Sequence, residues 1–179
     1  MLGSLTTVPA LDRPDLLAET VAAGLAALGD DRVLVAEIDP ELADTAAFCE
    51  RYGVTLEQSA NCVVVAGRRG ETTTLAACVV LATTRADVNG SVRRRLDARK
   101  ASFAPMDTAV EASGMEYGGI TPVGLPAAWP VLLDVAVLEQ QWVVVGSGLR
   151  RSKLVLPGAL LGILPGAEVV EGLGVQVQG

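Results

Sequence analysis

Apolar residues recur at helical spacing in several segments of the chain. From Pro14 to Leu28 they follow the three- to four-residue period of an amphipathic helix, and Gly29 suits its C-terminal cap. Asp39 and Asp87 are typical N-cap residues, and Gly53 and Gly114 typical helix ends. On these signals we expect further helices over residues 40–52, 88–96, 105–113 and, beginning with proline, 157–164.

Short runs of Val, Ile, Leu and Ala predict strands between these helices. The segments ANCVVVA and TTTLAACVVLA flank the turn-like GRRGE, which predicts a β-hairpin. Further strands are expected at residues 33–38, 101–104, 131–134, 142–145, 152–156 and 167–170. Residues 114–130 form a long loop of glycine and proline, a kind of loop that is often functional. The pattern predicts one α+β domain, residues 1–179, with a mixed, largely antiparallel sheet.

Composition narrows the class of protein. Of 179 residues, 50% are apolar and only 3% aromatic, so the core is built from many small side chains. No apolar run reaches the roughly 18 residues that cross a bilayer, and the first residues do not resemble a signal peptide. The three cysteines include no CxxC pair, and we expect them to be reduced and buried. We therefore expect a cytoplasmic protein with no membrane partner.

The chain has no histidine and a net charge of −7. The missing imidazole excludes most zinc sites and the Ser-His-Asp and Cys-His types of catalysis. Neither a metal nor a cofactor is expected. The negative charge disfavours coating a long nucleic-acid backbone, so DNA is not an expected partner, whereas a small local contact with RNA remains open.

Two glycine-containing segments are candidates for chemistry. GITPVG, from Gly119 to Gly124, could point free backbone N–H groups at a carbonyl or an oxyanion; the alternative is an ordinary tight turn. Gly146-Ser147-Gly148 follows a strand and precedes Arg150, Arg151 and Lys153, so a ligand could approach the main chain there. The alternative is a hairpin turn with solvated arginines. Neither segment has nucleotide P-loop or dinucleotide-fold spacing.

Charged and nucleophilic residues elsewhere leave alternatives open. The stretch from Arg85 to Lys100 carries six positive and two negative residues, which could guide RNA or could be a solvated helix face. Arg68 and Arg69 are interpreted as solvated charges at a loop tip. Cys62 is interpreted as a buried thiol, because no histidine could activate it. Asp134, at the end of VLLD, faces a site or starts a turn.

The order of these segments resembles the YbaK/prolyl-tRNA synthetase-associated editing domain over about residues 45–172. The resemblance rests on ANCVVVA, DVNGSVRRRL, KASFAPMDTAVEASGMEYGGITPVG, VLLD and WVVVGSGLRRSKLVL, in that order. It implies a mixed β-sheet or barrel with surrounding helices. It also implies a free-standing domain that hydrolyses the ester of mischarged aminoacyl-tRNA by positioning the substrate and polarising its carbonyl.

The resemblance also implies site residues. Gly119, Ile120 and Thr121 would form the carbonyl pocket, and Lys153 would act beside them. The other substrate-binding residues would be Asn61, Gly118, Pro122, Gly124, Asp134, Gly146, Ser147 and Gly148.

Two positions depart from the family pattern. Asn61 and Cys62 stand where relatives carry a lysine in a K-T-L pattern, and Lys153 stands where several relatives carry an acidic residue. Our hypothesis is that Lys153 replaces the missing cation and binds the terminal phosphate or a carboxyl-derived oxygen. The alternative is a surface lysine on an exposed strand.

Two functions follow from the resemblance. The first is a deacylase acting on the 3′ end of tRNA that carries a small amino acid such as alanine, cysteine or proline. The second is an inactive binding module for a nucleotide, an aminoacyl-tRNA end or a protein partner, which the neutral Asn61 favours. The apolar composition leaves a homodimer open.

Overall fold

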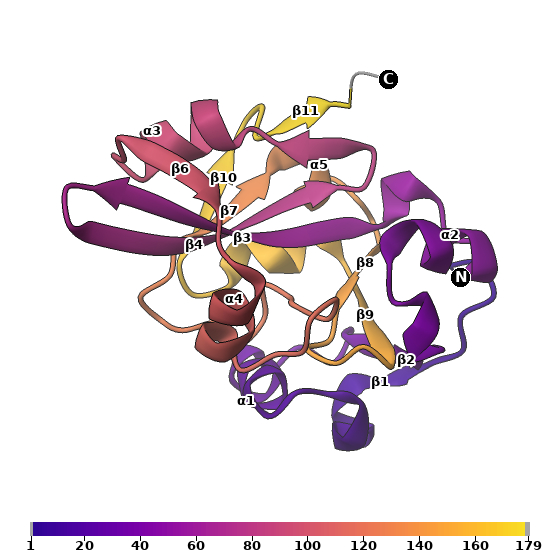
Figure 1. Ribbon diagram of the computed structural model, residues 1–179. Coiled ribbons are helices and arrows are strands. Elements are labelled where there is room, and N and C mark those ends of the chain that lie inside the picture. Colours follow the sequence, from indigo (N-terminus) through magenta and orange to yellow (C-terminus); the bar gives the residue numbers. More distant parts are fainter. Residues whose placement is uncertain (1, 178–179) are drawn as a thin grey trace.

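The computed structural model describes residues 2–177, in which the strands form three sheets (Figure 1). The first sheet has four strands, all antiparallel, in the order β1-β2-β9-β8. Its strands are β1 (Thr7–Pro9), β2 (Leu34–Glu37), β8 (Val143–Gly146) and β9 (Ser152–Leu156). Gly146 is paired with Lys153 at one end of this sheet.

The second sheet has five strands in the order β10-β7-β4-β3-β6. Its strands are β3 (Ala60–Arg69), β4 (Thr72–Leu81), β6 (Lys100–Phe103), β7 (Val131–Asp134) and β10 (Ala167–Val170). Strands β3 and β4 form the expected hairpin, and β7 runs parallel to both β4 and β10. The mixed, largely antiparallel α+β class is confirmed, and the sheets do not close into a barrel.

The expected helices are present, two of them shortened by a break. Instead of one helix over residues 14–28, a 3-10 turn at Pro14–Leu16 precedes α1 (Glu19–Leu28). Instead of one helix over residues 40–52, Asp39 caps a 3-10 turn and Asp44 caps α2 (Thr45–Tyr52) separately. The Asp44 side chain accepts a hydrogen bond from the N–H of Ala46, two residues further along the chain, and so starts a new helix. Helix α2 therefore begins at Thr45.

The remaining helices follow the expected caps. Asp87 caps a π-helical turn, Val88–Val92, that continues into α3 (Arg93–Arg95), and α4 spans Met106–Ser113. Gly29, Gly53 and Gly114 end their helices in the left-handed conformation, as predicted. The helix expected at residues 157–164 is a 3-10 helix, Gly158–Ile163.

Three short strands and one short α-helix were not expected from the sequence. Strand β1 was missed, and so was the pair of β5 (Thr84–Ala86) and β11 (Gly174–Gln176). Helix α5 (Val135–Leu138) follows β7 directly. Each has only three or four residues, too few for an apolar period to be recognised.

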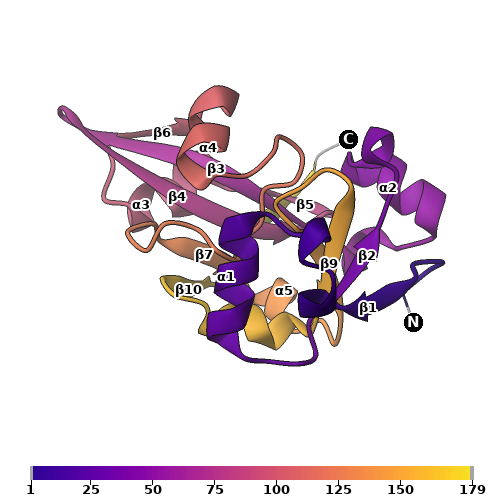
Figure 2. The same ribbon diagram turned by 90° about the horizontal axis from the view of Figure 1, so that it is seen from below.

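The two larger sheets meet near the start of β3, where Ser59 forms a parallel bridge with Val144 of β8. The main core lies between the sheets and α1, as the view from below shows (Figure 2). The loop after α4 contacts the glycine turn between β8 and β9, where Gly148 N–H donates a hydrogen bond to the Gly119 carbonyl at 2.7 Å. A cavity opens at this meeting point.

Asp134 has a structural role at the end of β7. Its buried carboxylate accepts a hydrogen bond from Ala136 N–H at 2.8 Å, which caps α5, and another from Gly174 N–H. Of the two interpretations, the start of a turn is therefore what the structure shows.

We expect Asp134→Ala to lower the free energy of unfolding by about 1–3 kcal/mol, because two partly buried N–H groups lose their acceptor. Urea denaturation measures this loss, and Asp134→Asn, which keeps one acceptor oxygen, serves as the milder control. Equal stability of wild type and Asp134→Ala would contradict the assignment.

Candidate functional site

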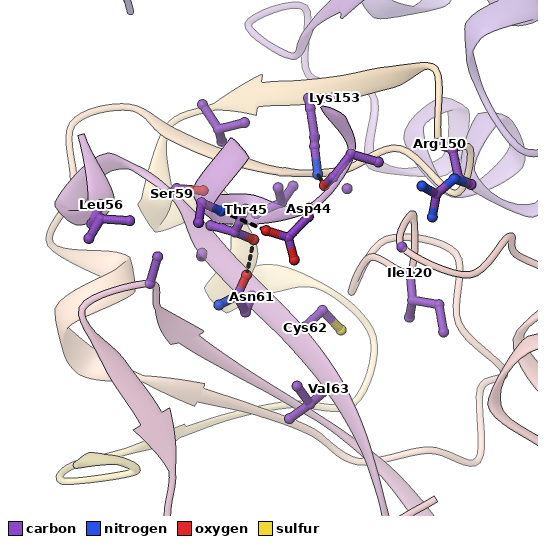
Figure 3. Close-up of a pocket in the computed structure, with 18 of the residues that line it drawn as sticks. Asp44, Thr45, Leu56, Ser59, Asn61, Cys62, Val63, Ile120, Arg150 and Lys153 are labelled. Atoms are coloured by element: carbon purple, nitrogen blue, oxygen red, sulfur yellow. Dashed lines mark hydrogen bonds between the residues drawn. The ribbon is translucent and has the colours of Figure 1, made fainter. Parts of the chain in front are cut away.

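A cavity of about 840 Å³ opens where the two large sheets and α2 meet (Figure 3). Its walls come from the start of β3, strands β8 and β9, the N-terminal end of α2 and the loop after α4. The predicted site residues that line it are Asn61, Gly118, Ile120, Gly146 and Lys153. Residues far apart in the sequence therefore converge on one cavity.

Lys153 lies in the wall of this cavity and is 8% exposed. Its Nζ donates to the Ala43 carbonyl at 3.1 Å and lies 5.4 Å from the centre of the Phe48 ring. Burial lowers the pKa of Lys153, an effect that Cys49 and Asp44 oppose. Within residues 2–177 no carboxylate forms an ion pair with it. Because an ammonium has three donors, two remain for a ligand.

Asn61 lies on β3 and is held by α2. Its Oδ1 accepts a hydrogen bond from Thr45 Oγ1 at 2.6 Å, and Figure 3 shows Asp44 and Thr45 between Asn61 and Lys153. The bond occupies the acceptor of the amide and leaves its NH₂ group as a donor. Asn61 therefore offers a neutral, oriented donor to the cavity.

The loop after α4 supplies backbone donors. Over the described part of the chain, the N–H groups of Gly118 and Ile120 have no hydrogen-bond acceptor, and both residues line the cavity. The N–H groups between and after them are occupied: Gly119 donates to the Glu116 carbonyl at 3.0 Å, and Thr121 contacts Met115 Sδ at 3.5 Å. Gly118 and Ile120 are thus two residues of this loop with free donors at the cavity.

The glycine turn between β8 and β9 packs against that loop. A Cβ on Gly146 would lie 2.5 Å from the Gly119 carbonyl oxygen and 2.7 Å from that of Ile120. A Cβ on Gly119 would lie 2.7 Å from the Leu149 backbone. A side chain at either position would clash, because the backbone of the turn and the backbone of the loop are in direct contact. The turn therefore supports the loop.

Several predicted site residues lie outside the cavity. Ser147 is buried and binds Ser152 Oγ at 2.7 Å, and Gly148 packs against Ala18. Thr121 is fully buried, and its hydroxyl has no partner within residues 2–177. The rest of the set lies elsewhere: Pro122 and Gly124 face a groove beside α1, and Asp134 caps α5.

The cavity also contains residues that were not predicted as site residues. Arg150 donates from Nη1 to the Tyr117 carbonyl and from Nη2 to the Pro40 carbonyl, both at 3.1 Å. It therefore fastens the loop after α4 to the segment before α2. Asp44 and Thr45 also line the cavity. The Asp-Thr pair at a helix start was the only sequence signal that could have pointed to them.

Cys49 and Cys78 are buried, as expected, whereas Cys62 is only half-buried. Cys62 borders the cavity, and burial raises its pKa far above the ordinary value. Burial raises the pKa of Cys78 to about 12 and also raises that of Cys49. A thiol that stays protonated is a poor nucleophile, so none of the three has the environment of a catalytic cysteine.

Among residues 2–177 there is no cluster of three or more cysteine, aspartate or glutamate side chains that could hold a metal ion. No helix in that range is both long enough and apolar enough to cross a membrane.

Comparisons with solved structures show the same fold. A structure described as a "putative trans-editing enzyme for prolyl tRNA synthetase" aligns with a TM-score of 0.73 and 23% identity, covering 86% of this chain and 94% of that one. A crystallised hypothetical protein aligns with a TM-score of 0.76 and 21% identity, covering 88% of this chain and all of that one, 100%. No curated protein matches this chain.

The family model named "Aminoacyl-tRNA editing domain" matches residues 39–163, well over half of the chain. The match includes the start of β3, the loop after α4 and β9, which together form the cavity. This chain therefore belongs to the aminoacyl-tRNA editing domain family.

Proposed function

We propose that this protein is a free-standing deacylase that hydrolyses the ester of mischarged aminoacyl-tRNA in trans. The observation that carries the proposal is the convergence of Lys153, Asn61 and the free N–H groups of Gly118 and Ile120 on one cavity. Family membership and the likeness to a structure described as a trans-editing enzyme support it. Its substrates are in the cytoplasm, where we place the protein.

The chemistry requires a positioned ester and a polarised carbonyl. The N–H groups of Gly118 and Ile120 donate to the carbonyl oxygen, which becomes an oxyanion when water attacks the carbonyl carbon. The bond from that carbon to the ribose oxygen then breaks, releasing the free amino acid and a ribose hydroxyl. The proton lost by water is transferred to the departing ribose oxygen. Positioning alone can supply many kcal/mol, so a cavity without histidine can accelerate this reaction.

Two polar side chains of the cavity, Lys153 and Asn61, bind the 3′ end of the tRNA. The Lys153 ammonium binds the phosphate before the terminal adenosine, and Asn61 donates to a neutral oxygen of the substrate. Cys62, Val63 and Val145, which line the same cavity as Ile120, are all of small or medium size. Such walls fit a small side chain, as in alanine, cysteine or proline.

The direct test is a panel of tRNAs mischarged with alanine, cysteine, serine and proline. We expect release of one small amino acid well above the spontaneous rate, with Lys153→Ala showing no such release. Hydrolysis at the spontaneous rate for every substrate would overturn the proposal.

The alternative, a binding module without hydrolysis, is favoured by one observation: neutral Asn61 stands at the position of the family lysine. A stable amide analogue of aminoacyl-adenosine distinguishes the two functions. Binding of the analogue together with turnover of the ester supports the deacylase, whereas binding without turnover supports the module.

A further inference from the structure

A second pocket, of about 570 Å³, lies along the outer edge of the five-stranded sheet. Four cations line it: Arg68 at the end of β3, Arg93 in α3, Arg99 before β6 and Lys100 in β6. Asn89, Ser102 and two alanines complete its walls, so no carboxylate contributes to them. In a chain of net charge −7, this is a concentrated positive site.

The carboxylates of neighbouring residues are engaged elsewhere. Asp97 pairs with Arg69 at 3.1 Å, and Asp87 accepts hydrogen bonds from the N–H groups of Gly90 and Ser91. Over residues 2–177, none of the four cations of this pocket forms an ion pair. Their charge is therefore available to a ligand.

Without a bound ligand, the clustering of cations in this pocket lowers the stability of the fold. Arg68 and Lys100 are directly opposite in the β3–β6 ladder, and like charges at opposed positions destabilise a sheet. The Arg99 N–H also donates to the Arg68 carbonyl at 2.8 Å, which holds the two arginines on adjacent backbone. A bound anion would offset this repulsion, and arginine forks suit phosphate oxygens.

We propose that this edge pocket binds consecutive backbone phosphates of RNA, and, given the proposed function, those of the tRNA acceptor stem. Arg68 and Asn61 are seven residues apart on β3, which corresponds to roughly 23 Å of extended strand. Figure 1 shows the hairpin tip and α2 on opposite sides of the molecule. If the terminal adenosine of the tRNA occupies the cavity, the short unpaired 3′ end of the tRNA spans the distance to the edge pocket. The edge pocket then contacts the base-paired acceptor stem.

The shape of the site fits a strand of RNA better than a single small anion. The cations come from β3, the segment before β6, β6 and α3, and these four charges share one pocket of about 570 Å³, which is more charge and more space than a single phosphate requires. Phe103, the next residue of β6 after Ser102, is 61% exposed and offers a ring on which a base can stack. The pocket thus offers contacts for phosphates, and Phe103, next to it in sequence, offers one for a base.

Binding of an uncharged tRNA transcript over a range of salt concentrations tests the inference. The variant Arg68→Gln/Arg99→Gln removes two charges whose side chains make no hydrogen bond within residues 2–177. We expect about tenfold weaker binding and a slope of log K against log salt shallower by about two. The matched control is Arg13→Gln/Arg32→Gln, which removes two exposed, ion-paired arginines elsewhere and is expected to bind tRNA as the wild type does.

Unchanged tRNA affinity and salt slope in Arg68→Gln/Arg99→Gln would overturn the inference, as would an equal loss in the control. So would inorganic phosphate binding that depends on these arginines while tRNA binding does not. An aminoacyl-trinucleotide ester, which lacks the stem, separates the two proposals. Its turnover should be the same in wild type and variant. If wild type binds tRNA through this pocket but hydrolyses no ester, only the deacylase proposal fails.

Discussion

Replacing Lys153 by methionine is expected to lower kcat/KM for mischarged tRNA by about 10²- to 10³-fold. The tRNA phosphate loses its cation, and removing one partner of a buried, hydrogen-bonded charge pair costs about 2–5 kcal/mol. Methionine keeps the unbranched stem beside Phe48 but has no ammonium. The free energy of unfolding should change by no more than about 1 kcal/mol, because one hydrogen bond is lost while a desolvated charge is removed. Single-turnover deacylation and urea denaturation measure the two quantities.

The pH profile separates a substrate-binding lysine from a structural one. Burial lowers the pKa of Lys153, so wild-type activity should fall as pH rises through a value below the ordinary 10.5. In Lys153→Arg the side chain stays charged, and this alkaline fall should move to higher pH. Wild-type activity in Lys153→Met, or an identical alkaline limb in Lys153→Arg, would contradict the assignment.

The same shift has a consequence for stability. Between the lowered folded-state pKa of Lys153 and its unfolded value, the unfolded chain binds more protons than the folded one. The contribution of this group to stability therefore rises with pH across that window, and Lys153→Met should remove the rise.

Gly146→Ala is expected to have the second largest effect. The added methyl would meet the carbonyl oxygens of Gly119 and Ile120 at 2.5 and 2.7 Å, and these belong to backbone that cannot rotate away. We expect a loss of about 1–3 kcal/mol in the free energy of unfolding. Because the displaced loop carries the Gly118 and Ile120 donors, deacylation should also fall, by about 10²-fold for a shift near 1 Å.

Gly162→Ala is the matched control for this substitution. Its Cβ would meet only the flexible end of Leu138, at 3.2 Å, and Gly162 does not line the cavity. Thermal unfolding and deacylation assays on both variants make the comparison. If Gly146→Ala matched Gly162→Ala in both assays, the close approach of the turn and the loop would not matter for function.

Local signals predicted most of the secondary structure because each acts over a few residues. The β-branched runs on either side of GRRGE predicted the β3–β4 hairpin, and Gly29, Gly53 and Gly114 end the helices that they were expected to end. The predictions that differed include the continuous helices over residues 14–28 and 40–52. In the second of these, Asp39 and Asp44 both bind downstream N–H groups, and the sequence pattern does not show which cap dominates.

The candidate site was only partly predictable. A sequence motif gives only the order of residues along the chain. It therefore placed cavity-lining residues and residues outside the cavity in one predicted site. The first group is Gly118, Ile120 and Gly146, and the second is Gly119, Thr121, Ser147 and Gly148. Successive residues of a loop point in different directions, however, and a glycine can serve a ligand or a close backbone contact equally well. Gly119 touches the Leu149 backbone and Gly146 touches the loop, so much of the glycine pattern reflects packing.

By itself, the sequence determined the α+β class, the family pattern and the absence of imidazole chemistry, since these depend on residue type, local period and order. Tertiary structure alone decided that Lys153 is buried beside Asn61 and Asp44, and that Arg68 is paired with Lys100. The physical reason is the same in both cases. Strand pairing and sheet packing bring together residues remote in the chain, and burial and neighbouring charge then set what their side chains can do.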